Sequence, residues 1–250
     1  MKSFGICSIA TNGYEKYLID CIDSFKKVNS HEYLINWYIF SDVSTNLSQR
    51  ITRVDGVVFH FFDIPPYGWP DATLMRYHIY HERINDLKSD FLMHLDADML
   101  FLPDFRFPKI EDHPELMHFV KHPGFAKINW NFYRPIETLK IIWRLVIFGG
   151  YGSWEKRKKS KAFLPRSMRK SYYCGGIWFG GKRAFGRFIV ESKEAVANDL
   201  ARNLIASWHD ESHLNRFAAF NKIRVLGPHY CFDGKVDLGT RLPYVLAVEK

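Results

Sequence analysis

The chain has 250 residues, of which 47% are hydrophobic and 25% charged, an ordinary globular composition long enough to bury a full core. Its longest apolar segment, residues 141–148 with Arg144 inside it, is too short to span a bilayer. The formal net charge of +8 suits an anionic partner, but no stacking platform or groove-reading helix pattern is present, so no nucleic acid is expected.

In chain order, short apolar runs alternate with helical patterns. Helices are predicted at residues 17–28 and from residue 70 or 71 to about residue 88, where Pro and Asp suit the first turn. Strands are predicted at residues 4–11, 37–40, 57–64, 91–101 and 116–120. This alternation indicates a mixed or parallel sheet with helices on both faces.

Two aspartates stand inside the apolar run FLMHLDADMLF at residues 91–101. An ionised carboxylate is costly to bury without a partner, so Asp96 and Asp98 are expected to serve a ligand. They fall at the carboxyl end of the predicted strand, where ligands bind in such sheets, and residues two apart share one face. Because Mg²⁺ and Mn²⁺ bridge carboxylates to phosphates, the pair predicts a metal site that holds a diphosphate. Asp-x-Asp alone is a weak motif.

The string WHDESHLN at residues 208–215 predicts the start of another helix. Asp210 can cap this helix, and Glu211 then lies in the first turn, where the helix dipole favours its ionised form. By itself the string also fits a helix cap with two surface histidines. A zinc site at His209 and His213 is not expected, because the HExxH arrangement is absent.

Six further strings lie in order around this one. They are WPDATLMR at residues 69–76, DAD at 96–98, HPGF at 122–125, SWEKR to FLP at 153–165, YYCGGIWFGG at 172–181 and PHYCFD at 228–233. Together the seven strings resemble glycosyltransferase family 6, which includes the blood-group A and B transferases and the α-1,3-galactosyltransferases. The resemblance covers roughly residues 4–233, and WHDESHLN is its most specific part.

The resemblance implies a GT-A fold in a single domain over residues 1–250, an α/β fold with a mixed, mostly parallel sheet, helices on both faces and a Rossmann-like nucleotide-binding half. It implies a retaining enzyme that moves N-acetylgalactosamine or galactose from UDP-GalNAc or UDP-Gal to a galactose-terminated glycan or glycolipid in α-1,3 linkage. The metal would be Mn²⁺, or alternatively Mg²⁺. Many bacterial relatives have Asn-x-Asn and work without metal, whereas this chain keeps both acids.

The resemblance also assigns roles to residues at matching positions. Asp96 and Asp98 would hold the metal, and Glu211 would be the catalytic carboxylate that stabilises or captures the oxocarbenium-like sugar, with a covalent or a front-face mechanism left open. The acceptor would contact His122, Ser153, Trp208 and Asp233. The donor would contact Ile9, Ala10, Thr11, Tyr14, Thr73, Arg76, Ala97, Cys174, Gly175, Gly176 and Asp210. Gly176 leaves room beside the sugar, which favours UDP-GalNAc over UDP-Gal as the donor.

Two other functions fit part of these signals. A metal-dependent UDP-sugar hydrolase could share the metal and donor site, but it needs no acceptor platform such as Trp208. A catalytically silent lectin-like module would have no need of Asp96, Asp98 and Glu211 together.

The chain departs from the family pattern at several points. Lys156 stands where the family has arginine, so one bidentate guanidinium pairing is expected to be lost. Residues 126–150 form an insertion, predicted either as a helix on the core or as an element that contacts a membrane. In the second case the basic run at residues 156–161 would attract an anionic membrane surface.

The expected compartment follows from the cysteines and the N-terminus. The cysteines (Cys7, Cys21, Cys174 and Cys231) are scattered in apolar surroundings, where reduced buried thiols are the default. The opening Met1-Lys2-Ser3 leads into strand-like sequence without a signal peptide. A cytoplasmic protein is expected. If the insertion contacts a membrane, the protein would bind peripherally at its inner face.

Overall fold

A computed structural model describes the chain except for residues 29–31, 126–138, 140–151, 236–237, 239–241 and 249–250. The strands are β1 (Ser3–Ala10), β2 (Leu34–Ser41), β3 (Val57–Asp63), β4 (Phe91–Leu95), β5 (Met99–Phe101), β6 (Met117–Lys121), β7 (Tyr173–Gly181), β8 (Ile223–Leu226) and β9 (Val245–Ala247). The helices are α1 (Glu15–Phe25), α2 (Ser44–Arg50), α3 (Asp71–Leu74), α4 (Arg76–Glu82), α6 (Lys182–Leu200) and α7 (His209–Phe220).

The main sheet has the strand order β3-β2-β1-β4-β7-β6-β8, and β5 pairs with β9 in a separate ribbon. The pairs β1–β2, β2–β3, β1–β4 and β6–β8 are parallel, whereas β7 runs antiparallel to both of its neighbours. The order of the strands reverses at β1, which lies between β2 and β4. Ligands bind at such a switch point, beyond the carboxyl ends of the strands.

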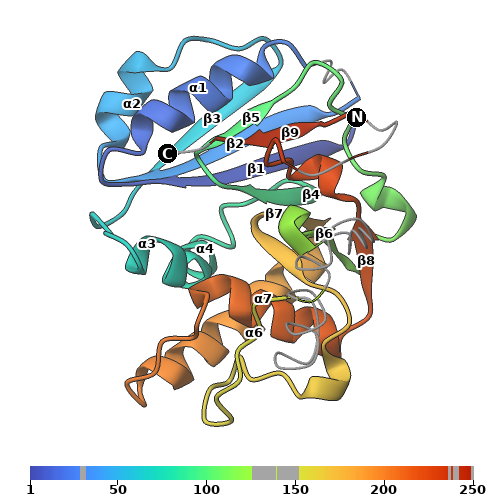
Figure 1. The fold of residues 1–250 in the computed structure, drawn as a ribbon. Helices are drawn as coiled ribbons and strands as arrows, with labels where there is room; N and C mark the ends of the chain where they lie inside the picture. The colour runs from blue at the N-terminus through green and yellow to red at the C-terminus, as the bar shows by residue number, and fades with distance from the viewer. Residues whose placement is uncertain (29–31, 126–138, 140–151, 236–237, 239–241, 249–250) are drawn as a thin grey trace.

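Two hydrophobic cores cover the two faces of this sheet. On one face α1 contributes Leu18, Cys21, Ile22 and Phe25 to a cluster with alternate residues of the strands. On the other face α4, α6 and α7 pack over residues such as Leu92 and Trp178. Figure 1 shows the two sets of helices on opposite sides of the sheet. The predicted mixed, mostly parallel sheet with helices on both faces is therefore confirmed.

Two of the predicted elements had the wrong bounds. The strand at residues 91–101 is two strands, β4 and β5. The amide N–H of Asp96 makes the last hydrogen bond to β7, at the Gly176 carbonyl (2.8 Å); residues 97–98 then form a turn, and β5 pairs with β9. The alternation argument therefore does not place the two acids, since Asp96 follows the end of β4 and Asp98 lies in the turn.

The helix predicted from residue 70 to about residue 88 is interrupted and shorter. It is interrupted at Met75, and α4 ends at Glu82. Turns follow as far as Asp86, in a stretch that contains Asn85 and Asp86, whose side chains compete for the backbone and disfavour a helix interior. After the interruption, α4 begins at Arg76, and the side chain of Arg76 is buried.

No helix in the described ranges is long and apolar enough to cross a membrane. The predicted insertion at residues 126–150, with its apolar segment 141–148, lies outside the described residues apart from Leu139, which is exposed.

Candidate active site

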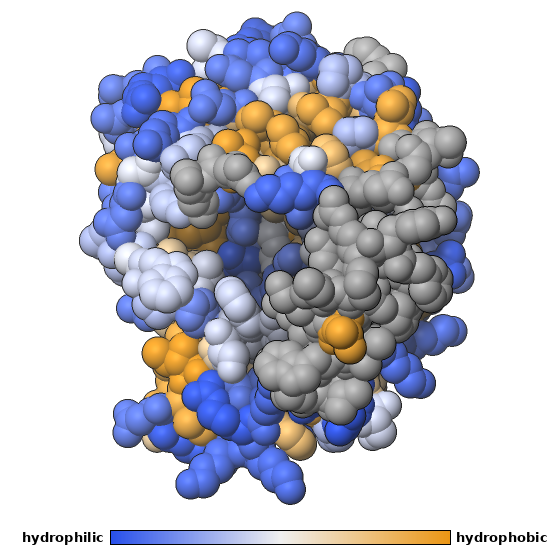
Figure 2. Space-filling model, in the orientation of Figure 1, coloured by the Kyte–Doolittle hydropathy of each residue, from blue (hydrophilic) through white to orange (hydrophobic). Residues whose placement is uncertain are grey.

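A pocket of about 200 Å³ opens where β1 and β4 end, at the switch point of the sheet. Most of the predicted donor and metal residues line it, and Figure 2 shows that this side of the molecule is hollowed in its middle. Ala10, which was predicted to contact the donor, does not line the pocket because it is buried in the core. The lining residues are Ile9, Thr11, Asn12, Tyr14, Tyr67, Trp69, Ala72, Thr73, Arg76, Asp96, Ala97 and Asp98.

Arg76 links the two acidic parts of the site. Its side chain is 5% exposed, and one Nη2–H donates to Asp96 Oδ1 (2.8 Å). Its Nη1 donates to the Gly175 carbonyl (2.9 Å) and lies 2.9 Å from Asp210 Oδ2. A buried carboxylate needs a paired charge, and a planar guanidinium can serve two at once. Arg76 thus ties the end of β4 to β7 and α7.

A second set of contacts orients Asp96. The ring of His94 is buried, and burial lowers its pKa to about 4, so the imidazole is neutral near pH 7. Its Nε2–H donates to Asp96 Oδ1 (3.0 Å), while its Nδ1 accepts the hydroxyl proton of Tyr80 (2.7 Å). One oxygen of Asp96 is therefore held by protein donors, and this fixes the rotamer of the side chain.

Helix α7 places Asp210 and Glu211 beside the glycines of β7. The helix begins at His209, so Asp210 lies in its first turn and the predicted capping role is wrong. The Glu211 carboxylate accepts a hydrogen bond from the Gly175 amide (2.7 Å). A Cβ atom on Gly175 would lie 3.3 Å from Asp210 Oδ2 and 3.4 Å from Glu211 Oε2, so a glycine permits the close approach. Asn215 fixes α7 to β7 through paired hydrogen bonds with Tyr173.

Burial raises the pKa of both acids on α7. The pKa of Asp210 rises to about 6, although Arg76 opposes the rise, and the pKa of Glu211 rises to about 7, although hydrogen bonds from Tyr172 and Gly175 oppose it. Neither acid lines the pocket, but Arg76, which does, contacts Asp210 and the Gly175 carbonyl. Carboxyl groups with perturbed pKa values beside a pocket are typical of catalytic sites.

Two of the four predicted acceptor residues contact Tyr172. Its hydroxyl donates to the Ser153 carbonyl (3.2 Å), and its ring centroid is 5.7 Å from that of His122. Burial lowers the pKa of His122, and the negative charge of Asp233 opposes this effect. Trp208 is 54% exposed, as a platform for a sugar would be.

Cys174 of β7 is a buried thiol beside Cys231. A hydrogen bond with Cys231 and the burial of the side chain both raise the pKa of Cys174. All four cysteines of the chain are free and buried, which confirms the prediction of buried thiols without disulfides.

Sequence reasoning missed several residues of this site. Trp69 is 80% exposed at the pocket, and its ring lies 5.0 Å from that of His209, which in turn contacts Thr73. Trp69 and His209 lie in the strings WPDATLMR and WHDESHLN, but no role at the pocket was predicted for either. His94 could have been found, because it is a polar residue in a buried strand two positions before Asp96.

Arg157, the residue after Lys156, keeps a bidentate pairing, and the loss of the pairing that an arginine at position 156 would make stays a prediction. The buried Glu155 is paired with Arg157 through both oxygens (3.0 and 2.6 Å) and also accepts the Ser207 amide N–H (2.8 Å). Since Arg157 supplies the fork, the lysine at position 156 does not weaken this clamp.

The acids of the pocket fit a hard divalent cation. Among the described residues no three His, Cys, Asp or Glu side chains gather into a complete metal site. Mg²⁺ and Mn²⁺, however, are commonly held by one or two carboxylates together with substrate phosphates and water. Asp96 and Asp98, both partly exposed at the pocket, match that donor set.

The mixed, mostly parallel sheet with helices on both faces is the arrangement of GT-A type glycosyltransferases. The sequence profile described as glycosyltransferase family 6 matches residues 146–249. An O-antigen biosynthesis glycosyltransferase, WbnI, of Escherichia coli is 25% identical over 89% of this chain and 82% of its own length. A globoside α-1,3-N-acetylgalactosaminyltransferase 1 of Gallus gallus is 23% identical over 93% of this chain and 62% of its own length. The profile match and these relatives together support a place for the chain in glycosyltransferase family 6.

One relative is more similar over a shorter stretch. The histo-blood group ABO system transferase 1 of Rattus norvegicus is 36% identical over 120 residues, which are 45% of this chain and 34% of the rat protein. Against the vertebrate relatives the chain thus spans between a third and two thirds of their length.

Proposed function

We propose that the protein is a retaining glycosyltransferase that moves N-acetylgalactosamine or galactose from a UDP-sugar to a galactoside acceptor in α-1,3 linkage. The supporting observation is that Arg76, which lines the pocket, joins Asp96 to Asp210 and to Gly175, whose amide N–H donates to Glu211. The name of the chicken relative agrees with the transfer of N-acetylgalactosamine in α-1,3 linkage. A donor-by-acceptor screen with mass-spectrometric analysis of products tests it, and release of free sugar without transfer would indicate a hydrolase instead.

The residues of the site divide the proposed reaction between them. Asp96 and Asp98 would hold Mn²⁺ or Mg²⁺, which supplies positive charge to the diphosphate leaving group when bound. Arg76 adds a fixed cation at the same end of the pocket. Ionised Glu211 stabilises positive charge on the sugar, and Gly175 lets the carboxylate come close to β7. Trp208 and the residues around Tyr172 would bind the acceptor.

The first prediction concerns the metal. Activity should require Mn²⁺ or Mg²⁺, and Asp98→Asn should weaken UDP-sugar binding and turnover together, because the amide is a poorer ligand for a hard cation. Turnover in metal-free buffer and titration calorimetry with UDP measure the two effects. Full activity in excess EDTA would contradict the prediction.

The second prediction concerns the donor. UDP-GalNAc is expected to be the preferred donor from the glycine at position 176, although Met99 Cε and Asp96 Oδ2 fill the place of its Cβ in the structure. The preference is measured as the ratio of kcat/KM for the two donors. Gly176→Ala is not a clean probe, since its Cβ would meet Met99 Cε at 2.4 Å and Asp96 Oδ2 at 3.0 Å. The wild-type ratio is therefore decisive, and a tenfold preference for UDP-Gal would refute the argument.

The third prediction concerns location. We propose a cytoplasmic enzyme with peripheral membrane contact, which the free buried cysteines and the exposed side chains of Lys156, Lys158 and Lys159 support. Each cation near an anionic leaflet contributes about 1 kcal/mol, so binding to anionic vesicles should fall steeply with salt. Replacing these three lysines by glutamine should abolish vesicle binding and spare activity on soluble acceptors. Wild-type protein that fails to sediment with anionic vesicles at low salt would end this proposal.

A further inference from the structure

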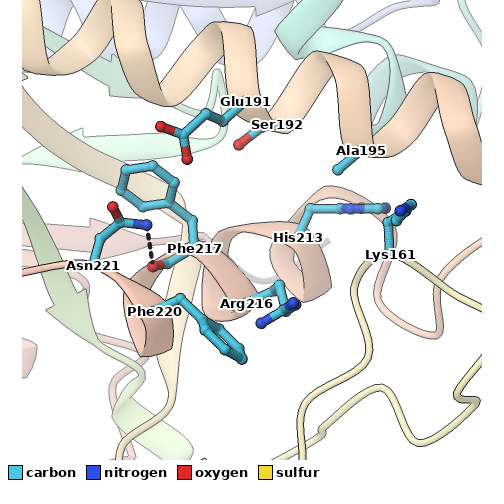
Figure 3. A pocket seen from close by; sticks show the side chains of 9 residues that line it. All are labelled: Lys161, Glu191, Ser192, Ala195, His213, Arg216, Phe217, Phe220 and Asn221. Atoms are coloured by element: carbon cyan, nitrogen blue, oxygen red, sulfur yellow. Dashed lines mark hydrogen bonds between the residues drawn. The ribbon is translucent and has the colours of Figure 1, made fainter.

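A second pocket, of about 260 Å³, lies between α6 and α7 and shares no residue with the donor pocket. Figure 3 shows side chains from both helices and from the segment that carries Lys161. The lining residues are Lys161, Glu191, Ser192, Ala195, His213, Arg216, Phe217, Phe220 and Asn221. The volume is several times the roughly 30 Å³ that a water molecule occupies in the liquid, so it can hold a small ligand.

Two basic side chains in this pocket lack hydrogen-bond partners. His213 is 2% exposed, and neither of its ring nitrogens makes a hydrogen bond. Its nearest acidic contact, from Nε2 to Asp199 Oδ2, is 3.7 Å and too long for a hydrogen bond. The buried Nη1 of Arg216 also has no partner. Leaving such groups unpaired costs folding free energy, which a ligand with acceptor oxygens would recover.

The nearest acid, Asp199, makes its hydrogen bonds to groups other than His213 and Arg216. Asp199 already accepts hydrogen bonds from the Ser160 hydroxyl (2.5 Å) and the Lys161 amide (2.6 Å). Burial lowers the pKa of the Arg216 guanidinium, and its planar face lies 3.4 Å from the centroid of the Phe220 ring. Stacking of this kind leaves the N–H groups at the edge of the guanidinium free to donate.

The charges are separated within the pocket. In Figure 3, Lys161 and His213 line one end with Arg216 beside them, whereas Glu191 lies at the other end near Asn221. Ala195 and Phe217 supply apolar walls. One end is thus suited to an anion, and the remaining volume is suited to a small, partly apolar body.

We propose that this pocket binds a small oxyanion, carried by a phosphate or a carboxylate group, between Lys161, His213 and Arg216. The oxyanion accepts hydrogen bonds from the Arg216 guanidinium and the Lys161 ammonium, both charge-assisted, and from the His213 ring. The bound group joins α7 to the loop that contains Lys161. Because Glu211 lies half a turn before His213 on α7, the ligand also stabilises the helix that carries the acids of the candidate active site.

The test uses inorganic phosphate and acetate as probes for the full chain. Ligand that binds only the folded state raises the unfolding temperature, so phosphate, acetate or both should stabilise the wild-type protein. The larger shift identifies the preferred group. Arg216→Gln and Lys161→Gln should each lower the affinity about tenfold or more, whereas Lys159→Gln, an exposed lysine on the same loop, should leave it unchanged. The imidazole NMR signal of His213, assigned with His213→Gln, should shift during the titration.

The comparison of variants separates this pocket from the donor pocket, which can also attract phosphate. Stabilisation that persists in full in both Arg216→Gln and Lys161→Gln would place the ion elsewhere and overturn the proposal. The same holds if neither probe shifts the wild-type unfolding temperature up to about 50 mM, a concentration at which millimolar binding is readily detected. Lys161 is exposed, so its variant is expected to fold and keeps the test informative if Arg216→Gln does not.

Discussion

Replacing Glu211 by glutamine should lower kcat by about two to four orders of magnitude, the size of effect seen when an electrostatic contact to a transition state is removed. The glutamine side chain carbonyl can still accept the Gly175 amide hydrogen bond (2.7 Å in the wild type), so the shape is kept and only the charge is lost. Donor affinity should change little, because the sugar gains positive charge only in the transition state. Steady-state kinetics and calorimetry with the donor measure the two quantities.

The control for this variant is Glu194→Gln, an exposed carboxylate on α6 that should leave turnover unchanged. A Glu211→Gln enzyme with near-normal kcat would show that another group carries the chemistry.

The same carboxylate should produce an acid limb in the pH profile. Burial raises the pKa of Glu211 to about 7, and the ionised form is the one proposed to be active. The ionised fraction grows as the pH rises, so kcat/KM should increase through about pH 7, where half of the carboxyl groups are ionised, and level off about one pH unit higher. Asp210, with its pKa raised to about 6, should steepen the decline at lower pH. A profile that is flat from pH 5 to pH 8 would contradict this assignment.

Replacing Arg76 by methionine should have the largest effect on stability. The change leaves the buried Asp210 carboxylate without its cation and removes the hydrogen bonds to Asp96 and Gly175. Breaking a buried ion pair from one side typically costs about 3–5 kcal/mol in the free energy of unfolding. Urea denaturation measures this loss, and activity should fall with it because the site loses a fixed cation.

Two further variants show whether the pairing itself is responsible. Arg83→Met removes an exposed partner of Asp86 (3.8 Å) and should cost no more than about 1 kcal/mol. Adding Asp210→Asn to Arg76→Met should restore part of the lost stability, since no uncompensated charge is then buried. If the double variant is as unstable as the sum of the single ones, the two side chains do not stabilise each other.

The sequence indicates the first half of the fold well and the second half poorly. Buried parallel strands read as continuous apolar runs, and β1, β2, β3 and β6 were located in this way. The strand β7 contains Gly175, Gly176, Gly180 and Gly181, a composition that disfavours strands, and its glycines are explained only by the side chains that pack against them. The pairing of β5 with β9 joins distant parts of the chain, and no local pattern reveals it.

The same contrast holds within the site. Asp96 and Asp98 were singled out by their place in an apolar run, and Glu211 by the resemblance of WHDESHLN to a family string. The bridge that Arg76 makes between Asp96 and Asp210 depends on how α4, β4 and α7 pack, and no role was predicted for the exposed Trp69. Residues that stand in a short characteristic string can therefore be predicted from the sequence, whereas residues whose role depends on tertiary contacts cannot.

The most direct test of the central proposal is the NMR spectrum of the product formed from a UDP-sugar and a galactoside with Mn²⁺ present. The proposed function predicts a new disaccharide linkage to O3 of the galactose, with the α configuration of the donor retained. A β-linked product, or free sugar as the sole product with every galactoside tried, would contradict it.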